Sequence, residues 1–430
     1  MNVSFYTLGC RLNQSETAVL ERSFEVKGYR VVGFDEPADI VVVNTCTVTE
    51  NGDADTRRIV NKINRINPKA RIALIGCQAQ MQKEKLATLP NVYFVVGNAR
   101  KMDLVEILND VGTMPESPPQ PVVIAPTIPR DAFTIPIAGI DRHHTRANIK
   151  IQDGCDFFCS FCEIPYARGR ARSRVFDDIL LEARALAAAG HKELVLTGIN
   201  LGTYNHEGKT IVDVIDSLES IDELKRIRIS SIEPTTIPLE MIERMRTNTK
   251  ICRYLHVPLQ SGSDHVLTLM QRKYTVQEYS NFINQVYRVV PQICLGTDVI
   301  VGFPGETDED FNQTYEVLRE LSLTYFHVFS YSRRTMAKSQ NLPDSVPATI
   351  IARRSEILRQ LSVRKRRLFL QGLLGTKHDV LIEEEKNGFW LGKTDHYAMV
   401  KIRSNKNLQN QIVTVELKTI DGQTIIGCGQ

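Results

Sequence analysis

The sequence of 430 residues has no stretch of about 18 consecutive apolar residues, the length that a membrane-spanning helix needs. Its first residues also lack the basic region and apolar run of a secretory signal peptide. We therefore expect a cytoplasmic protein with no membrane partner. Thiols stay reduced in that compartment, so the nine cysteines are expected to be metal ligands, catalysts or core residues rather than disulfides.

The sequence also lacks a strong excess of charge of either sign. Its net charge of +3 permits an acidic partner such as nucleic acid but does not require one. The shares of hydrophobic residues (42%) and charged residues (24%) are ordinary for a globular protein, which argues against a disordered chain. A chain of this length predicts two or three domains, and no internal repeat is present.

Segments typical of strands and helices alternate over residues 1–111. This alternation predicts a doubly wound α/β domain with a parallel sheet. The expected strands cover residues 3–8, 29–34, 39–44, 71–75 and 92–96, and the expected helices cover residues 15–24 (with Ser15 as N-cap), 53–66, 80–89 and 103–111.

Three further segments follow. Residues 112–140 are rich in proline and predict an extended linker. Residues 141–371 contain six strand–helix units, which predict a partial (β/α)6 barrel with its chemistry at the C-terminal ends of the strands. Residues 372–430 predict a small β-barrel. In the partial (β/α)6 barrel, a helix is expected at residues 176–189 and strands are expected at residues 148–152, 193–197, 226–231, 254–259, 297–302 and 325–330. In the small C-terminal barrel, strands are expected at residues 379–383, 389–391, 398–402, 412–417 and 423–426.

Cys155, Cys159 and Cys162 stand close together directly after the first expected strand of the partial barrel. Three thiolates on one loop can bind three irons of a 4Fe–4S cluster and leave the fourth iron open, and three neighbouring phenylalanines would shield that cluster from water. A structural zinc site needs four ligands, and no further Cys or His stands nearby to complete the set. Three core cysteines are a weaker interpretation of so dense a group.

Cys10, Cys46 and Cys77 each follow an expected strand of the N-terminal sheet. Parallel strands end at one edge of a sheet, where ligands bind in open α/β folds. We therefore expect these thiolates to converge and to hold a second 4Fe–4S cluster, again with one open iron. The alternative is that each is a small buried residue at a strand end. The remaining cysteines show no shared pattern and are interpreted as core residues: Cys252, Cys294 and Cys428.

The spacing of Cys155, Cys159 and Cys162 resembles the signature of the radical S-adenosylmethionine (SAM) superfamily. The resemblance implies that SAM binds the open iron and yields a 5′-deoxyadenosyl radical after one-electron reduction. It also implies a low-potential electron donor of the flavodoxin or ferredoxin type. Several later strand ends resemble the SAM-binding loops of that superfamily. The expected SAM contacts are Thr197, Gly198, Asn200, Ser231, Glu233, Gln260, Ser261 and Gly302.

Together with the N-terminal cysteines and the terminal barrel, the whole chain resembles the methylthiotransferase family. The C-terminal part looks like the TRAM domain, a barrel that binds RNA or substrate. Glu163 departs from the apolar residue that the family usually carries after the third cysteine of the loop. Residues 10–14, Cys-Arg-Leu-Asn-Gln, are most similar to the branch that acts on threonylcarbamoyl-adenosine beside the tRNA anticodon. The motifs that carry the resemblance are residues 9–14, 44–49, 76–77, 162–169 and 173–174.

The resemblance implies an enzyme that transfers a methylthio group to carbon 2 of threonylcarbamoyl-adenosine in tRNA. One SAM would methylate a sulfur at the N-terminal cluster, and a second SAM would be the radical source. An aromatic C–H bond is too weak an acid for base catalysis, which explains the radical cofactor. The sequence does not identify the sulfur donor. The alternatives are a methylthiotransferase acting on isopentenyl-adenosine in tRNA or on an aspartate of a ribosomal protein, and an iron–sulfur or zinc RNA-binding protein without catalysis.

Basic and aromatic residues indicate where RNA would bind. Residues 353–367 form a basic helical segment that could bind phosphates or form an ordinary solvated face. In the terminal barrel, Phe389 and Tyr397 could stack on bases, whereas Trp390 is expected to be a core residue. A second basic run lies beside the cysteine loop and is expected to meet the SAM carboxylate or RNA: Arg168, Arg170, Arg172 and Arg174.

Overall fold

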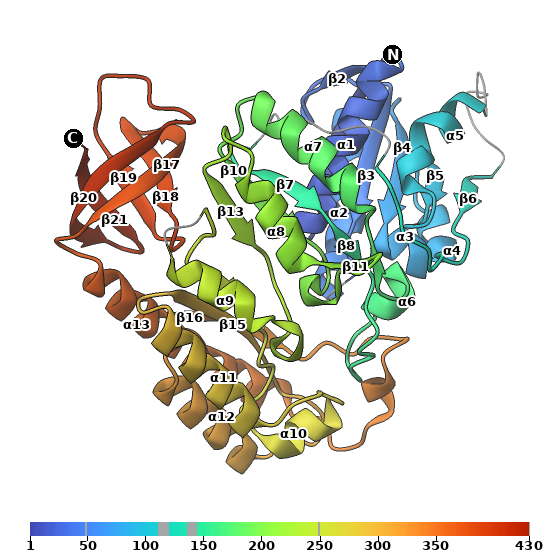
Figure 1. The fold of residues 1–430 in the computed structure, drawn as a ribbon. Coiled ribbons are helices and arrows are strands. Elements are labelled where there is room, and N and C mark those ends of the chain that lie inside the picture. The colour runs from blue at the N-terminus through green and yellow to red at the C-terminus, as the bar shows by residue number, and fades with distance from the viewer. Residues whose placement is uncertain (48–49, 111–119, 136–143, 248–249, 430) are drawn as a thin grey trace.

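The computed structural model describes residues 1–47, 50–110, 120–135, 144–247 and 250–429. Figure 1 shows three parts along the chain: an α/β part in blue and cyan, a central part running from green to orange, and a small barrel in red. In the described ranges, none of the helices is both long enough and apolar enough to cross a membrane.

The N-terminal part is a parallel sheet with the strand order β2-β1-β3-β4-β5-β6. Apolar side chains cover both faces, because alternate residues of each buried strand point to opposite sides. The predicted doubly wound sheet is therefore confirmed. Its strands are β1 (Asn2–Thr7), β2 (Arg30–Val32), β3 (Ile40–Thr45), β4 (Arg71–Gly76), β5 (Val92–Val96) and β6 (Val122–Ile124), and its helices are α1 (Arg11–Val26), α2 (Glu50–Ile66), α3 (Cys77–Met81), α4 (Lys83–Ala87) and α5 (Leu104–Asp110).

Three local predictions differ from this structure. Helix α1 begins four residues earlier than expected, so Cys10 is its N-cap and Ser15 is buried within the helix. The helix expected at residues 80–89 is divided into α3 and α4. The proline-rich segment supplies β6, which pairs with β5 and covers its free edge, although proline content alone predicted a linker. The linker residues 112–119 and 136–140 lie outside the described part of the chain.

The central part contains the six predicted strands in two three-stranded parallel sheets, ordered β13-β10-β7 and β14-β15-β16. Single backbone bridges, such as the one between Ser231 and His256, join the two sheets into an incomplete barrel. Its strands are β7 (Ala147–Lys150), β10 (Glu193–Thr197), β13 (Arg226–Ile229), β14 (Tyr254–His256), β15 (Cys294–Val301) and β16 (Tyr325–Ser330). Its main helices are α7 (Phe176–Ala188), α8 (Ile211–Glu219), α9 (Leu239–Arg246), α11 (Val276–Val289), α12 (Asp308–Glu320) and α13 (Ala348–Gly372).

Each strand of this barrel has an apolar face and a polar face. Leu194 of β10 and Ile227 of β13 belong to the large core under the helices. The residues between and beside them, such as Glu193 and Arg228, point the other way and are buried. The inside of the partial barrel is therefore lined by polar and charged groups, which is where the chemistry of such a barrel is expected.

The C-terminal part is a closed barrel with the order β17-β18-β19-β21-β20, as the sequence predicts for a small β-barrel. Trp390 is a core residue, as expected, and its indole N–H donates to the carbonyl of Ser404. The interpretation of Cys428 as a core residue is wrong, because it is exposed near the last residue of the final strand. The strands are β17 (Lys377–Lys386), β18 (Phe389–Thr394), β19 (Met399–Ile402), β20 (Ile412–Asp421) and β21 (Thr424–Gly429).

Two arginines of β13 attach this barrel to the central part. Arg226 donates to the backbone carbonyls of Asp379 and Lys393 at 2.6 and 3.0 Å. Arg228 donates to the carbonyls of Thr394 and Asp395, and its guanidinium also forms a buried ion pair with Glu193 at 2.6 Å. The C-terminal barrel is thus fixed by hydrogen bonds to its backbone, which do not depend on its side chains.

We predict that Arg228→Met lowers the free energy of unfolding by about 3 kcal/mol, because the change removes a partner of the fully buried Glu193 carboxylate. Arg253→Met is the matched control, since Arg253 pairs with Asp395 while 44% of its side chain is exposed. An exposed pair contributes at most about 1 kcal/mol. Urea unfolding monitored by circular dichroism measures the free energy of unfolding of both variants. Equal losses of that free energy in the two variants would contradict this account.

Candidate active site: two cysteine trios around a buried ion network

The first cysteine trio lies on the loop that follows β8 (Gln152–Asp153). Gly154 takes the left-handed conformation (φ +73°), and the Cys155 N–H donates to the carbonyl of Gly169 at 3.1 Å. Burial raises the pKa of the Cys155 thiol to about 11 and that of Cys162 to about 12, and it raises the pKa of Cys159 as well. These thiols are therefore neutral until a metal or cluster displaces their protons.

The second trio lies at the C-terminal edge of the N-terminal sheet. Cys10 caps α1 after β1, Cys46 directly follows β3, and Cys77 opens α3 after β4. These three neighbouring strands are parallel, so their ends meet at one edge. A Cβ atom placed on Gly9 would lie only 2.8 Å from the Cys46 sulfur, which shows how closely these loops approach. The structure thus places the three predicted residues at equivalent strand ends.

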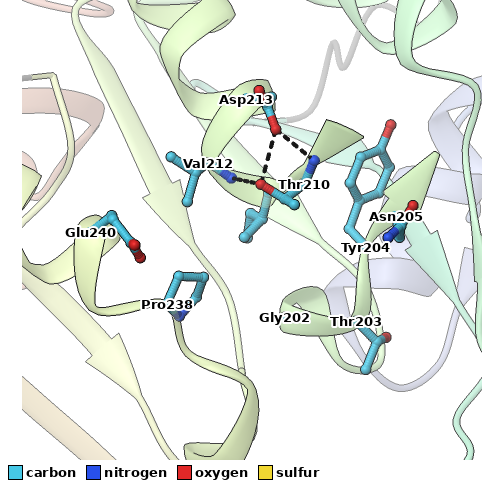
Figure 2. Close-up of a pocket in the computed structure, with 10 residues that line it drawn as sticks. Gly202, Thr203, Tyr204, Asn205, Thr210, Val212, Asp213, Pro238 and Glu240 are labelled. Carbon is cyan, nitrogen blue, oxygen red and sulfur yellow. Dashed lines mark hydrogen bonds between the residues drawn. The ribbon is translucent and has the colours of Figure 1, made fainter. Parts of the chain in front are cut away.

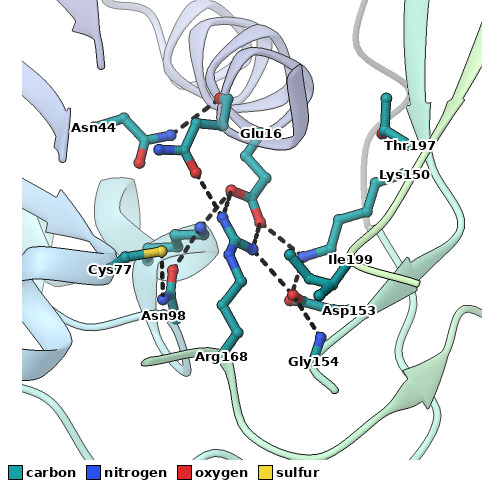
Figure 3. A network of polar contacts seen from close by, with 12 residues as sticks. Glu16, Asn44, Cys77, Asn98, Lys150, Asp153, Gly154, Arg168, Thr197 and Ile199 are labelled. Carbon is teal, nitrogen blue, oxygen red and sulfur yellow. Dashed lines mark hydrogen bonds and ion pairs between the residues drawn. The ribbon is translucent and has the colours of Figure 1, made fainter. Parts of the chain in front are cut away.

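Figure 3 shows a buried ion network with Cys77 of the second trio on one side and Gly154, which precedes Cys155 of the first trio, on the other. The Glu16 carboxylate of α1 accepts hydrogen bonds from Arg168 (3.1 Å), Lys150 (2.7 Å) and Lys101. Asp153, two residues before Cys155, accepts from Lys150 at 2.7 Å and from Arg168 at 3.0 Å. All five side chains are almost completely buried. The network therefore joins the N-terminal sheet to the first strand and loop of the central barrel.

This network contains two more cations than carboxylates, since Glu16 and Asp153 are shared by four cations: Arg168, Lys101, Lys150 and Arg172. A buried charge is costly unless it is paired. The second trio lies close by: negative charge on its sulfurs, Cys77 and Cys10, raises the pKa of Arg168, in opposition to burial. Thiolates of that trio would supply the missing negative charge.

This excess of positive charge fits a cluster-bound second trio. A zinc ion, with Zn–S bonds of about 2.3 Å, would hold three sulfurs about 3.8 Å apart. Among the described residues, neither trio forms a group of three ligand atoms within 4.8 Å of one another.

Asn98 and Lys101 connect the network to the second trio, and sequence reasoning did not find them. The Asn98 amide donates to the Cys77 sulfur at 3.4 Å, and Lys101 donates to the Asn98 carbonyl oxygen at 2.7 Å. Hydrogen bonds to cluster sulfurs tune the potential of a cluster. Both residues follow β5, and that position after a strand of the same sheet was the available signal.

Of the residues expected to contact SAM, Glu233 is linked to the first trio through Arg272. Arg272 donates to the Glu233 carboxylate and, at 3.2 Å, to the Cys159 sulfur. Burial raises the pKa of Glu233, in opposition to Arg272. The Asn200 side-chain oxygen accepts from the Glu233 backbone at 3.4 Å, and the Nδ2 amide of Asn200 has no partner among the described residues. An unpaired buried donor beside the cysteine loop is suited to a ligand.

The remaining expected SAM contacts have clear roles in the backbone. Thr197 donates from its hydroxyl to the Ile149 carbonyl at 3.0 Å, and Gly198 leaves no room for a side chain beside Gln152. Gln260 is left-handed (φ +70°) at the end of its loop. Ser231 pairs with His256 across the junction of the two sheets.

Ser261 and Gly302 make packing contacts in the structure, and their expected contact with SAM stays a prediction. The Ser261 hydroxyl is buried and lies 3.3 Å from the Thr314 hydroxyl of α12. Gly302 has φ +75°, and a Cβ atom there would lie 2.3 Å from Ile351 of α13. Both residues therefore set how closely helices approach the sheet.

Most of the basic run beside the loop is not available to RNA. Arg168 is 1% exposed and is bound by the ion network, and Arg174 is 1% exposed and pairs with Asp178 (2.6 Å) and Glu182. The expectation of ligand or RNA contact is therefore wrong for these two residues. Their carboxylate partners could not be identified from the sequence pattern. Arg170 is exposed, pairs with Asp156 and lies over the Phe158 ring.

Arg334 joins the loops of the two trios, and the only signal for it in the sequence is indirect. Its guanidinium donates to the Glu163 carboxylate at 3.0 Å and to the Thr47 hydroxyl at 2.6 Å. Glu163 directly follows Cys162, and Thr47 directly follows Cys46. The departure of Glu163 from the family's apolar residue is thus matched by a buried cation that bridges both cysteine loops.

A cavity of about 560 Å³ near the start of α8 lies outside this site (Figure 2). Its walls include Thr210 and Asp213, which form the capping box of α8. None of its described lining residues is a cysteine or an expected SAM contact. We therefore assign it no part in the chemistry.

We predict that Gly154→Ala prevents assembly of the first cluster, because the new Cβ atom would lie 2.0 Å from the carbonyl oxygen of Arg170. Gly208→Ala is the matched control: Gly208 is also left-handed (φ +81°), but its Cβ atom would meet nothing within 4 Å. The backbone penalty of about 1 kcal/mol is then shared by both variants. Iron and sulfide analysis after anaerobic reconstitution should show a lower cluster content in Gly154→Ala alone. A cluster content equal to that of the wild type in Gly154→Ala would contradict the prediction.

Comparison with known proteins agrees with this arrangement. Residues 149–318 match the model of the radical SAM superfamily, and residues 2–97 match an uncharacterized protein family, UPF0004. The chain is 37% identical to threonylcarbamoyladenosine tRNA methylthiotransferase MtaB of Aquifex aeolicus (95% of this chain, 98% of that protein) and 36% identical to the protein of the same name in Bacillus subtilis (96% and 93%). It is 32% identical to tRNA-2-methylthio-N(6)-dimethylallyladenosine synthase of Dehalococcoides mccartyi (96% and 94%).

Among solved structures, the chain has a similar fold to the radical SAM methyltransferase TsrM of Kitasatospora setae. The TM-score is 0.56 at 18% identity, over 77% of this chain and 75% of that one. The sequence matches extend over nearly the full length of the relatives, and both cysteine trios lie within the matched regions. The chain therefore belongs to the radical SAM methylthiotransferase family.

Proposed function

We propose that this protein transfers a methylthio group to carbon 2 of threonylcarbamoyl-adenosine beside the anticodon of tRNA. The observation that carries the proposal is the pair of cysteine trios on either side of one buried ion network. The near full-length similarity to enzymes named for this reaction supports the same substrate. A carrier of electrons would have all its irons bound by protein ligands, whereas each trio here is one ligand short.

Cys155, Cys159 and Cys162 would hold one 4Fe–4S cluster with SAM, and the second trio would hold the other. Bound there, the clusters and SAM would supply a carbon-centred radical and a sulfur that carries the methyl group. Arg272 places a positive charge beside the Cys159 sulfur and orients the Glu233 carboxylate. The electron donor of the flavodoxin or ferredoxin type and the cytoplasmic location stay predictions.

Residues around the first loop prepare the site for a ligand. The Gln152 side-chain oxygen accepts the backbone N–H groups of Ile199 (2.9 Å) and Asn200 (3.0 Å), which fixes the turn after β10. Ser160 fixes the other side of the loop by donating from its hydroxyl to the Leu269 carbonyl at 2.7 Å. The cysteine loop is therefore held from two directions, so ligand groups meet a preorganised surface.

The proposal predicts that Cys10→Ala still cleaves SAM but makes no methylthio product, because only the second trio loses a ligand. Cys155→Ala is expected to lose both activities. Cys428→Ala is the matched control, since Cys428 is exposed like Cys10 but lies far from either trio in the terminal barrel. Mass spectrometry of digested tRNA and of 5′-deoxyadenosine reports the two activities. Methylthio product formed by Cys10→Ala would refute the proposal. Absence of methylthio product with the wild-type enzyme would refute it as well.

We also propose that an arginine stripe on α13 and the TRAM-type barrel contact the tRNA. Arg353, Arg364 and Arg367 are exposed and lie on one side of the helix. Two other basic residues of the segment are engaged: Arg354 pairs with Glu306 at 2.6 Å, and Lys365 donates to backbone carbonyls. Arg359 is also exposed but lies on another side of the helix, so the stripe is the largest aligned group of arginines in the segment that can meet phosphates.

The triple variant of this stripe, Arg353→Gln/Arg364→Gln/Arg367→Gln, is expected to bind tRNA more weakly and to lower the salt dependence of binding. Each phosphate contact contributes about 0.7 to 0.9 to the slope of log K against log salt, so the slope should fall by about 2 to 3. Fluorescence anisotropy at several salt concentrations measures it. An unchanged slope would show that these arginines form an ordinary solvated face.

A further inference from the structure

A cavity of about 700 Å³ lies where the three parts of the chain meet. Arg11 of α1 and Arg359 of α13 line it from two sides. Aromatic side chains form much of its other walls: Tyr254 and Tyr325 come from β14 and β16 of the partial barrel, and Tyr397 comes from the terminal barrel. This volume is in the range of pockets that enclose one small ligand, such as a nucleoside with a substituent.

All charged residues that line this cavity are positive. Arg11, Arg359 and Arg366 all line it, and its described lining residues include no Asp or Glu. Arg11 donates to the Tyr397 hydroxyl at 2.6 Å, and Arg366 donates to the Tyr397 carbonyl at 2.8 Å. Arg359 is exposed and has no ion-pair partner among the described residues. Guanidinium groups without a carboxylate nearby favour an anionic ligand.

Other arginines at the same junction are neutralised, which makes the contrast specific to this cavity. Arg228 pairs with Glu193 at 2.6 Å, and Arg146 pairs with Glu383 at 2.5 Å. Both pairs lie behind Tyr397, whose ring faces the two guanidiniums at 5.1 and 5.5 Å. Among the described residues, the arginines that line this cavity form no ion pair, although Arg11 also borders a neighbouring cavity that contains Glu383 and Glu384.

The pKa of the Tyr397 hydroxyl is sensitive to the positive charges around the cavity. Tyr397 has the left-handed conformation (φ +62°), and the charges of Arg11, Lys393 and Arg146 lower the pKa of its hydroxyl to about 8, although burial opposes them. A phenol responds to the same positive potential that a ligand carboxylate would meet. The positions of the arginines and the lowered pKa of the Tyr397 hydroxyl therefore both indicate a positive potential in the cavity.

The cavity adjoins the second cysteine trio, because Arg11, which lines it, directly follows Cys10. On another side, His327 lines the cavity, and its ring lies 5.6 Å from that of His256, which contacts Asp298 at 3.0 Å. The cavity therefore lies between the second trio and polar side chains of the partial barrel.

We propose that this cavity receives the substrate adenosine and that Arg11 and Arg359 bind the carboxylate of its substituent. The inference rests on the proposed function and names the residues that select its substrate. Arginine binds carboxylates through paired N–H groups, and the tyrosine faces suit stacking on a purine. An uncharged apolar substituent, such as isopentenyl, would cover the guanidiniums without pairing them, which is unfavourable.

The test compares binding of three anticodon-loop RNAs to the anaerobically reconstituted full-length enzyme by fluorescence anisotropy. The first carries threonylcarbamoyl-adenosine, the second its carboxylate methyl ester, and the third unmodified adenosine. We expect the wild type to bind the acid about tenfold more tightly than the ester, as is typical of a charged hydrogen-bonded pair. Arg11→Gln and Arg359→Gln should each reduce that ratio towards one. Arg184→Gln, an exposed arginine on the outer helix α7, should leave the ratio unchanged.

Three outcomes would overturn the inference. The wild type could bind acid and ester equally, or both variants could keep the wild-type ratio. The variants could also weaken the binding of all three RNAs (the acid, the ester and the unmodified one) by the same factor. That result would show that the arginines contact tRNA phosphates. Arg11→Lys, which keeps the charge but loses the paired N–H geometry, controls for folding and should retain part of the preference. Failure of the proposed function itself is distinct, because the wild type would then form no methylthio product on any of the three RNAs.

Discussion

The buried ion network around Glu16 is the constraint on which the rest of the molecule depends. It consists of buried charged groups from α1, the short helix after β5, β7, β8 and the helix that follows the first cysteine loop. Removing Glu16 would leave its three cations buried without their shared carboxylate, at a cost of several kcal/mol. The two cysteine trios are therefore not on independent domains that happen to touch. Their relative position is determined by electrostatics that tolerates little displacement.

Much of this arrangement is predictable from the sequence, because it follows from chain geometry. Three cysteines after three strands imply a shared sheet edge once the strands are parallel, and the structure has them there. The six strand–helix units and the closed terminal barrel follow from periodicity in the same way. The burial of single cysteines outside the trios was harder to predict from the sequence: Cys252 and Cys294 are buried as expected, while Cys428 is exposed.

The sequence could not predict pairings between residues far apart in the chain. Arg168 looked like a surface cation because its run of arginines contains no acid, and its partner Glu16 lies 152 residues earlier. Arg354 likewise belongs to a basic helical segment but pairs with Glu306. A polar side chain shows its burial only when its partner is known, so charge runs overestimated the surface available to RNA. The proline-rich stretch was misjudged for a related reason, since β6 needs the edge of β5 to exist as a strand.

Helix α1 carries three separate duties within two turns: Cys10 at its N-cap, Arg11 at the cavity wall and Glu16 in the ion network. In an α-helix, one inserted or deleted residue rotates everything beyond it by about 100°. An insertion after Arg11 would turn the Glu16 carboxylate away from its three cations while the cysteine stayed in place. The spacing of these residues is therefore inherited as a unit, so in related sequences length changes should be absent from the start of this helix even where its residue types vary.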